Sequence, residues 1–234
     1  MHSTLLPTLG LSLLALSTVS TSCVPVPSAS RGFRLAVNVT DPTKDTNQPP
    51  LQGQYLHLLH IGAGSERACV GPSPGPIFYQ NGTCDDFATE TIDIITDIHS
   101  RPWTPERLSL AGWDDELGLG IYGFFWAGSG GIRLTRLWDP CSYSTVQEGA
   151  PTESTLVVCR NRTIPYYGPD IMWDIVNWVQ ASSGTHLVIP EGCVAVRFVP
   201  ECAVLNDDLP PDAYSSHEFA QEVRCYEDVK SVVW

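Results

Sequence analysis

Apolar and polar residues alternate with a period of two in several short runs, which predicts β-strands. Leu35, Val37 and Val39 fall on one side of a predicted strand over 34–40. The other side carries Asn38, which we expect to face solvent. A loop is predicted over 41–53 because it is rich in proline and asparagine. Further strands are predicted over 55–61, 92–98, 117–126, 132–138, 156–160, 186–189 and 194–199.

One segment departs from this period, because its apolar residues recur at helical spacing. It predicts a single packed helix over about 169–181, which Pro169 would start and Gly184 would follow. A glycine-rich turn over 128–131 predicts a hairpin between the runs on either side of it. The sum is a mainly β fold, an antiparallel sandwich or barrel with one packed helix. The apolar helical positions are Ile171, Met172, Ile175, Val176 and Val179.

The predicted strand over 117–126 has a face that combines glycine with aromatic residues. Gly118 and Gly120 lie there, and glycine inside a strand often marks close approach by a ligand or by another backbone. This face is a candidate wall for an apolar cavity, although aromatic residues more often fill a core. The aromatic residues of this face are Tyr122, Phe124 and Trp126.

The N-terminus predicts export from the cell. Residues 5–19 are mostly apolar or small, which is typical of a signal peptide, here expected over 1–22. The remaining 23–234 has a length that suits a single β domain. No later run approaches the roughly 20 apolar residues that a membrane-spanning helix needs.

Eight cysteines fit an oxidising compartment and predict a disulfide-stapled fold. Sequence proximity favours the pairs Cys69–Cys84 and Cys141–Cys159, although the connectivity stays open. Cys23 lies at the expected cleavage region, so its place in the mature chain is open as well. The seven other cysteines are Cys69, Cys84, Cys141, Cys159, Cys193, Cys202 and Cys225.

Three Asn-X-Thr sequons predict N-glycosylation at Asn38, Asn81 and Asn161. A single sequon often occurs by chance. Their coincidence with an export signal and many cysteines indicates a eukaryotic secretory route and a secreted protein.

Acidic residues outnumber basic ones by 26 to 13, for a net charge of −13. Such a surface repels phosphate and anionic lipid, which argues against nucleic-acid and membrane partners.

His57 and His60 face opposite sides of a predicted strand, so they cannot share a metal ion. The cysteine spacings match no zinc module and no nucleotide-binding or GxSxG motif occurs, so we expect no metal and no cofactor.

Three segments carry a resemblance to known proteins: Phe33-Arg34-Leu35, 55–64 (YLHLLHIGAG) and 189–202 (IPEGCVAVRFVPEC). They resemble small secreted proteins of filamentous fungi, most of which are domains of unknown function. In its size, export signal, sequons and cysteines the chain is also similar to the secreted hetero-Diels–Alderases of fungal tropolonic sesquiterpenoid pathways. This second resemblance rests on overall build and transfers no catalytic residue.

Four functions are compatible with these observations, and the last of them is a hydrolase. The first is a cofactor-independent cyclase of hetero-Diels–Alderase type, which binds a small apolar organic substrate between the aromatic residues above. Its expected hydrogen-bond donor is His60 or Arg133. The second is a carbohydrate-binding or cell-wall protein with exposed tryptophans, and the third is a secreted effector or inhibitor without enzymatic activity. A pocket of roughly 300 Å³ or more would argue against the third. The substrate and the oligomeric state are not predicted.

Overall fold

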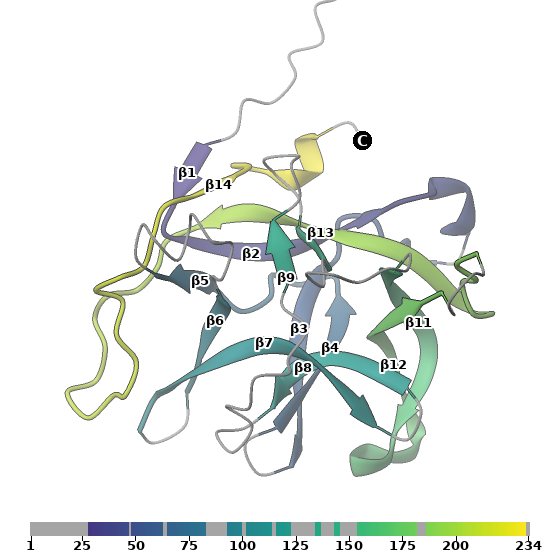
Figure 1. The fold of residues 1–234 in the computed structure, drawn as a ribbon, viewed down its shortest axis with the longest axis horizontal. Coiled ribbons are helices and arrows are strands. Elements are labelled where there is room, and N and C mark those ends of the chain that lie inside the picture. The colour runs from purple at the N-terminus through teal and green to yellow at the C-terminus, as the bar shows by residue number, and fades with distance from the viewer. Residues whose placement is uncertain are drawn as a thin grey trace, which may run out of the picture.

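The chain is built of antiparallel strands, as its alternating pattern predicts (Figure 1). A computed structural model describes residues 28–46, 48–62, 65–82, 93–99, 102–113, 116–122, 134–136, 143–145, 154–181 and 186–232. The signal peptide expected over 1–22 lies outside these ranges. Within them, helical structure is limited to the single 3-10 turns η1 (Pro42–Lys44), η3 (Pro165–Tyr167) and η4 (Val229–Ser231). No helix in the described ranges is long and apolar enough to cross a bilayer.

Fourteen strands lie in the described part of the chain. They are β1 (Ser28–Ser30), β2 (Gly32–Val39), β3 (Tyr55–Gly62), β4 (Ser65–Gly71), β5 (Phe78–Asn81), β6 (Asp93–Ile98), β7 (Thr104–Trp113), β8 (Glu116–Tyr122), β9 (Leu134–Arg136), β10 (Tyr143–Thr145), β11 (Ser154–Ile164), β12 (Gly168–Gln180), β13 (Cys193–Ala203) and β14 (Val223–Cys225).

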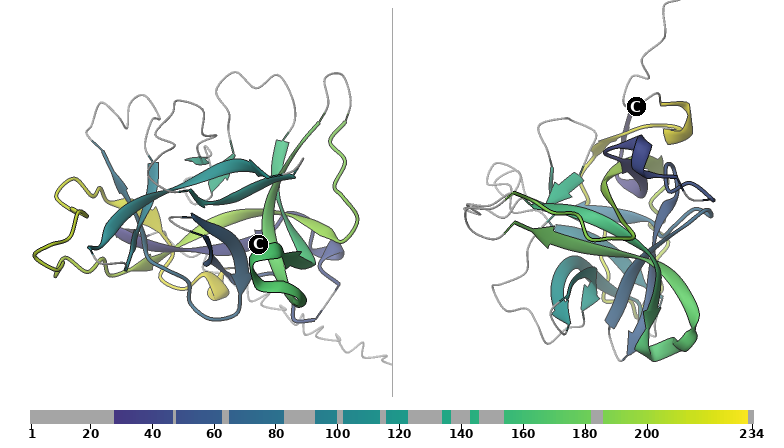
Figure 2. Two further views of the ribbon diagram at one scale, coloured as in Figure 1. Left: turned by 90° about the horizontal axis from the view of Figure 1, so that it is seen from below. Right: turned by 90° about the vertical axis from the view of Figure 1, so that its right-hand side faces the viewer.

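The strand pairings close two circuits that share β2, β3 and β4 (Figures 1 and 2). One circuit runs β2–β3–β4–β8–β7–β6–β5 and returns to β2. The other runs β2–β3–β4–β12–β11–β13 and also returns to β2. The sheet therefore curls back on itself, which leaves few exposed strand edges and explains how one sheet encloses a core.

The main core lies inside this curled sheet and receives residues from both circuits. Leu35, Val37 and Val39 of β2 enter it, as their alternation predicts. Phe78 comes from β5, on one circuit, and Trp178 from β12, on the other. Burial of such large apolar side chains contributes about 1.5–3 kcal/mol each. Residues from both circuits therefore pack into one apolar core.

The prediction that Asn38 faces solvent is wrong, because its side chain is only 1% exposed. The second face of β2 is covered as well, and Ala36 packs there against Val199 and Val229. Oδ1 of Asn38 accepts a hydrogen bond of 3.1 Å from Nε of Arg197 on β13. Alternation identifies the face that enters the core, but it does not show whether the other face is covered.

The predicted helix over 169–181 is also wrong, because this segment is strand β12. Ile175, Val176 and Trp178 are all buried, with Ile175 in one apolar cluster and the other two in the main core. A strand covered on both faces buries consecutive residues, and its apolar positions can therefore imitate helical spacing. The β-branched residues of the segment favour the strand. Ile171 and Met172, at its start, are exposed.

The predicted hairpin between 117–126 and 132–138 is not formed by the described strands. β8 pairs with β7, β4 and β12, whereas β9 pairs with β10. The range 186–189 is irregular rather than a strand. Conversely, β4, β5 and β7 occupy segments for which the sequence pattern predicts no strand. β4 forms a hairpin with β3, and β7 forms a hairpin with β8, so a partner adjacent in sequence does not by itself make a strand visible in the local pattern.

Candidate functional site

The residues predicted to form a cyclase site are only partly described. Phe124, Trp126 and Arg133 lie outside the described residues, and for Tyr122 only the position in β8 is described. His60 is exposed on β3, where its ring meets the ring of Tyr166 edge to face at 5.5 Å. The predicted constellation therefore stays a prediction.

The glycine face of β8 borders a polar contact. Gly118 pairs with Asn177 of β12, and Gly120 pairs with Arg67 of β4. Cross-strand partners project from the same face of a sheet, so both side chains lie on the glycine face. Nη2 of Arg67 donates a buried hydrogen bond of 2.6 Å to Oδ1 of Asn177. The face that the sequence pattern suggests as a ligand wall therefore also carries a guanidinium–amide pair.

A cleft of about 390 Å³ opens between β3, β6 and the C-terminal segment that follows β13. This volume is within the range of small-molecule sites. Its apolar lining is formed by Leu58, Pro76, Ile77, Ile98, Trp103 and Leu205. Its polar lining is formed by His57, Glu66, Thr96, Asp97, His99, Asn206 and His217. Leu58 and Ile98 also pack against the main core, so the cleft reaches the apolar interior.

Two stacked rings form one wall of the cleft, between the end of β6 and the start of β7. The rings of His99 and Trp103 are nearly parallel, with centroids 4.1 Å apart. The backbone carbonyl of Trp103 accepts a hydrogen bond of 2.8 Å from the backbone N–H of Tyr214. The C-terminal segment thus fixes the backbone that presents this flat surface, which suits contact with a planar ligand.

Two carboxyl groups influence each other, and one of them lies in the cleft. Glu66 of β4 lines it, and burial raises the pKa of Glu66, with the His60 ring as a smaller opposing influence. Burial also raises the pKa of Glu106 on β7 to about 7, and the negative charge of Glu66 adds to that increase. Oε2 of Glu106 is buried without a partner among the described residues. A positive charge placed here would relieve both the desolvation and the mutual repulsion.

His217 also lines the cleft, where its ring contacts two carboxyl groups. Its Nε2 lies 2.8 Å from Oδ2 of Asp97, and its Nδ1 lies 3.2 Å from Oδ1 of Asp207. Carboxylates only accept, so both contacts are hydrogen bonds when both ring nitrogens carry hydrogen. Oδ1 of Asp97 accepts from the Tyr79 hydroxyl at 2.8 Å. Because both ring nitrogens contact carboxyl groups, His217 holds the C-terminal segment against β6.

The same network perturbs the two groups at its ends. Burial raises the pKa of Tyr79 above its ordinary value, and the hydrogen bond to Asp97 raises it further. A hydrogen bond from Arg31 lowers the pKa of Asp207. That guanidinium lies 2.7 Å from the Asp207 carboxylate. The chain segment before β2 is thereby joined to the segment after β13.

His57 lines the cleft, whereas His60 does not. His60 is the cross-strand partner of Glu66 and shares its face with Leu58, and both of these residues line the cleft, so the period of two alone does not decide which histidine borders it. Nε2 of His57 lies 2.9 Å from the carbonyl oxygen of Ser73. His57 is therefore held by a loop contact. Of the cleft residues, Glu66, Asp97, Trp103 and His217 carry no local sequence signal, because they converge from four separate segments.

The disulfides differ from those that sequence proximity favours. Cys159 of β11 pairs with Cys193 of β13, and Cys202 pairs with Cys225. The prediction Cys141–Cys159 is therefore wrong. Cys69 is a buried free thiol, so the pair Cys69–Cys84 is not formed. Cys159 and Cys193 are direct cross-strand partners, and this adjacency overrides their separation of 34 residues.

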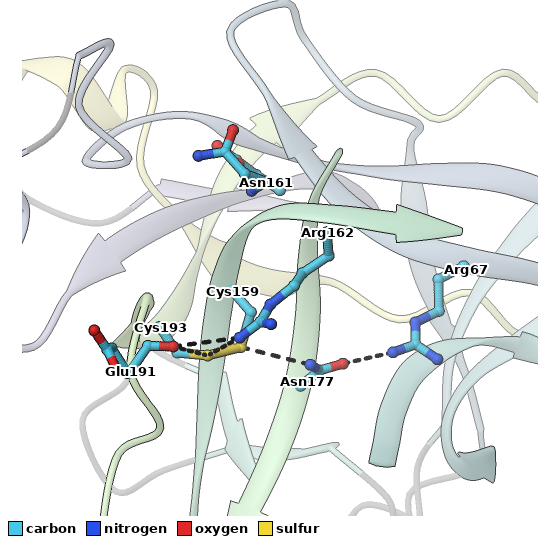
Figure 3. The surroundings of a disulfide bond; sticks show 8 residues. Arg67, Cys159, Asn161, Arg162, Asn177, Glu191 and Cys193 are labelled. Atoms are coloured by element: carbon cyan, nitrogen blue, oxygen red, sulfur yellow. Dashed lines mark hydrogen bonds between the residues drawn. A yellow bond between two sulfur atoms is a disulfide. The ribbon is translucent and has the colours of Figure 1, made fainter. Parts of the chain in front are cut away.

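Polar groups surround the Cys159–Cys193 bridge (Figure 3). Nδ2 of Asn177 lies 3.5 Å from Sγ of Cys159, in a buried contact. Nη2 of Arg162 lies 3.8 Å from Sγ of Cys193 and 3.3 Å from the carbonyl oxygen of Glu191. Each sulfur of the bridge therefore has a hydrogen-bond donor directed towards it.

The three sequons lie in different environments. Asn38 is buried, so the folded chain exposes no amide nitrogen there for a glycan. Nδ2 of Asn81 donates a hydrogen bond of 2.9 Å to the carbonyl oxygen of Ser216. Asn161 is exposed at an irregularity of β11, with a positive φ of 54°. Its side chain points away from the nearby disulfide (Figure 3).

The tryptophan side chains that the structure describes are buried or half-buried. Trp178 is 4% exposed, and Trp103 and Trp173 are half-buried. Among groups of three or more histidine, cysteine, aspartate or glutamate side chains in the described residues, none could hold a metal ion.

The fold and the cleft define a disulfide-stapled, mainly β protein with a ligand-sized cavity. The chain belongs to the family described as Domain of unknown function (DUF7907), whose pattern matches residues 30–202. It is 35% identical over 216 residues to a Stachybotrys chartarum protein described as Antigenic protein SchS34. That match covers 90% of this chain and 92% of the relative. No solved structure matches the chain significantly. The resemblance to fungal proteins of unknown function is thereby confirmed, and the likeness to hetero-Diels–Alderases stays a hypothesis.

Proposed function

We propose that the chain is an exported protein that binds a small, ring-containing organic amine in the cleft beside Trp103. Two disulfides and a fungal relative described as antigenic are consistent with secretion. The cleft volume of about 390 Å³ favours a small ligand over a role without one.

Glu66 is the observation that carries the preference for an amine. It is a carboxyl group in a cleft that Leu58 and Ile98 connect to the apolar core, and no hydrogen bond to it occurs among the described residues. Burial raises its pKa, and Glu106 adds a second buried carboxyl group nearby. An ammonium group would pair with this carboxylate, while the ligand ring would lie against Trp103 and Ile98. The net charge of −13 also attracts cations and repels anions.

Three indole compounds that differ in charge test this proposal. Tryptamine is a cation, tryptophol is neutral and indole-3-acetate is an anion, while all three share one ring. We expect calorimetric affinity to fall in that order, and to fall for tryptamine in the Trp103→Ala variant. Tyr166→Ala is the matched control, because Tyr166 is 56% exposed and does not line the cleft. Equal binding of the three compounds would reject the preference for an amine, and binding of none would reject the cleft as a site for such ligands.

Cycloaddition of hetero-Diels–Alderase type is a second candidate, favoured by the same raised carboxyl pKa values. Burial raises the pKa of Glu66 and of Glu106, which favours the protonated form, and a protonated carboxyl group can donate a hydrogen bond to a carbonyl as charge develops there. In this alternative Glu66 replaces His60 and Arg133 as the donor, and Trp103, Leu58 and Ile98 hold the two reactants. A reactive enone mixed with a polyene tests it. A product ratio equal to that of the buffer blank excludes the activity for those reactants.

A further inference from the structure

We propose that Cys159–Cys193 is a thiol-exchange site, which a low-molecular-weight thiol reduces in preference to the Cys202–Cys225 bridge. This inference concerns the side of the sheet that carries the Arg67–Asn177 contact, and it is independent of the ligand cleft (Figure 3).

The first support is the set of donors around the bridge. Arg162 directs Nη2 at Sγ of Cys193, and Asn177 directs Nδ2 at Sγ of Cys159. The Asn177 amide is itself polarised, because its Oδ1 accepts the hydrogen bond of 2.6 Å from Arg67. Such donors interact weakly with a neutral disulfide but strongly with a thiolate. They therefore stabilise the reduced form and make the bridge easier to reduce.

The second support is the lack of neutralising carboxylates. Among the described residues, no salt bridge involves Arg67 or Arg162. The Nε atoms of both guanidiniums are buried without a partner in that same part of the chain. By contrast, Arg160 lies 3.0 Å from Asp45. The chain has twice as many acids as bases, yet Arg162 beside this disulfide and Arg67 behind Asn177 have no carboxylate partner among the described residues. A thiolate that forms on reduction would provide their counter-charge.

The geometry also determines which sulfur reacts. Cys159 is 3% exposed, whereas Cys193 is half-buried at the start of β13, so an external thiolate reaches Sγ of Cys193. Cys69 is not a resolving thiol in this arrangement. It pairs in register with Ile175, which pairs with Cys159, so two strand spacings, about 10 Å, separate Cys69 from Cys159. Disulfide formation requires Cα atoms closer than about 7 Å.

The exchange balances with two molecules of glutathione. The first thiolate attacks Sγ of Cys193, the protein S–S bond breaks, and the electron pair passes to Sγ of Cys159 beside Asn177. The second thiolate attacks the glutathione sulfur of the mixed disulfide and releases Cys193 as a thiolate beside Arg162. Two glutathione thiols are thereby oxidised to glutathione disulfide, and the protein bridge gains two electrons and becomes two thiols.

Differential alkylation and mass spectrometry test the proposal on the folded full chain. The protein is equilibrated at a series of ratios of reduced to oxidised glutathione, and the reduced fraction of each bridge is measured. We expect Cys159–Cys193 to be reduced at a lower ratio than Cys202–Cys225. We also expect Arg162→Gln to raise the ratio required for Cys159–Cys193 by about tenfold, the effect of losing one charge-assisted hydrogen bond.

Two further variants separate this effect from a general loss of stability. Arg162→Lys retains the charge, so it should keep most of the parent behaviour. Arg224→Gln removes an exposed arginine next to Cys225 and should leave Cys159–Cys193 unchanged. Reduction of both bridges at the same ratio would overturn the proposal. So would an Arg162→Gln variant that behaves like Arg224→Gln, or an Arg162→Lys variant that behaves like Arg162→Gln.

Discussion

Nη2 of Arg67 lies 2.6 Å from Oδ1 of Asn177, and both side chains are buried. This contact joins β4, which both circuits share, to β12, which belongs to one of them. It also lies on the face of the sheet to which Gly118 and Gly120 of β8 belong. The pair is therefore a structural link between the two halves of the fold.

Replacing Asn177 with leucine should lower the free energy of unfolding by about 2–3 kcal/mol, because Arg67 keeps its charge and loses its buried acceptor. Urea denaturation measures this change. The double variant Arg67→Met/Asn177→Leu should recover part of the loss, since it removes the unpaired charge. A single variant within about 0.5 kcal/mol of the parent protein would show that the contact is not stabilising.

The sequence pattern predicts some strands of this arrangement correctly and misassigns others. Leu35, Val37 and Val39 alternate, and the structure confirms both the strand and the face that enters the core. The segment containing Ile175 and Val176 does not alternate, because this strand carries apolar residues on both of its buried faces. Local periodicity reports whether one side of a segment is buried, and it does not report a second covering layer.

The site was less predictable than the fold. Glu66, Asp97 and Trp103 come from separate segments, and they approach one another only because the sheet closes into circuits. The Cys159–Cys193 bridge likewise follows from the pairing of β11 with β13, whereas proximity in sequence favours Cys141. The cleft and the disulfide both depend on which distant strands pair and in which register. Composition and residue spacing carry no information about that pairing.

Glu106 should make the protein less stable as the pH rises from about 4.5 to 7. Its pKa is raised in the folded state, so the folded chain retains a proton that the unfolded chain loses in this window. The contribution is fully present below the ordinary pKa and is lost as the pH approaches 7. Glu106→Gln should remove this pH dependence and stabilise the protein at pH 8 by about 1–2 kcal/mol, after allowance for solvent screening. Thermal unfolding at pH 4.5 and pH 8 measures both effects, and an unchanged pH profile would contradict the assignment.

Tyr79→Phe should destabilise the protein by about 1 kcal/mol, because Asp97 loses the hydroxyl donor at 2.8 Å. The loss should also loosen the C-terminal segment around His217, which Asp97 holds. Hydrogen exchange over 205–221 measures this local effect. Tyr214→Phe is the control, since Tyr214 is 70% exposed. Equal exchange rates in the two variants would show that the hydrogen bonds of Asp97 do not restrain residues 205–221.

Glycosylation should occur at Asn161 and not at Asn38. Asn161 is exposed, whereas Asn38 is buried and accepts a hydrogen bond from Arg197. In protein secreted from a fungal host, Asn161→Gln should lower the intact mass by one glycan, and Asn38→Gln should remove none. A glycan found at Asn38 by peptide mass spectrometry would contradict the buried position of that residue.

The affinity of Glu66→Gln for tryptamine tests the proposed cleft most directly. Loss of the carboxylate should weaken tryptamine binding by about tenfold and leave tryptophol binding within about twofold of the parent value. This difference would show that the charge of Glu66, and not the shape of the cleft alone, selects the ligand. Equal affinities of the parent protein and the variant for tryptamine would contradict the account.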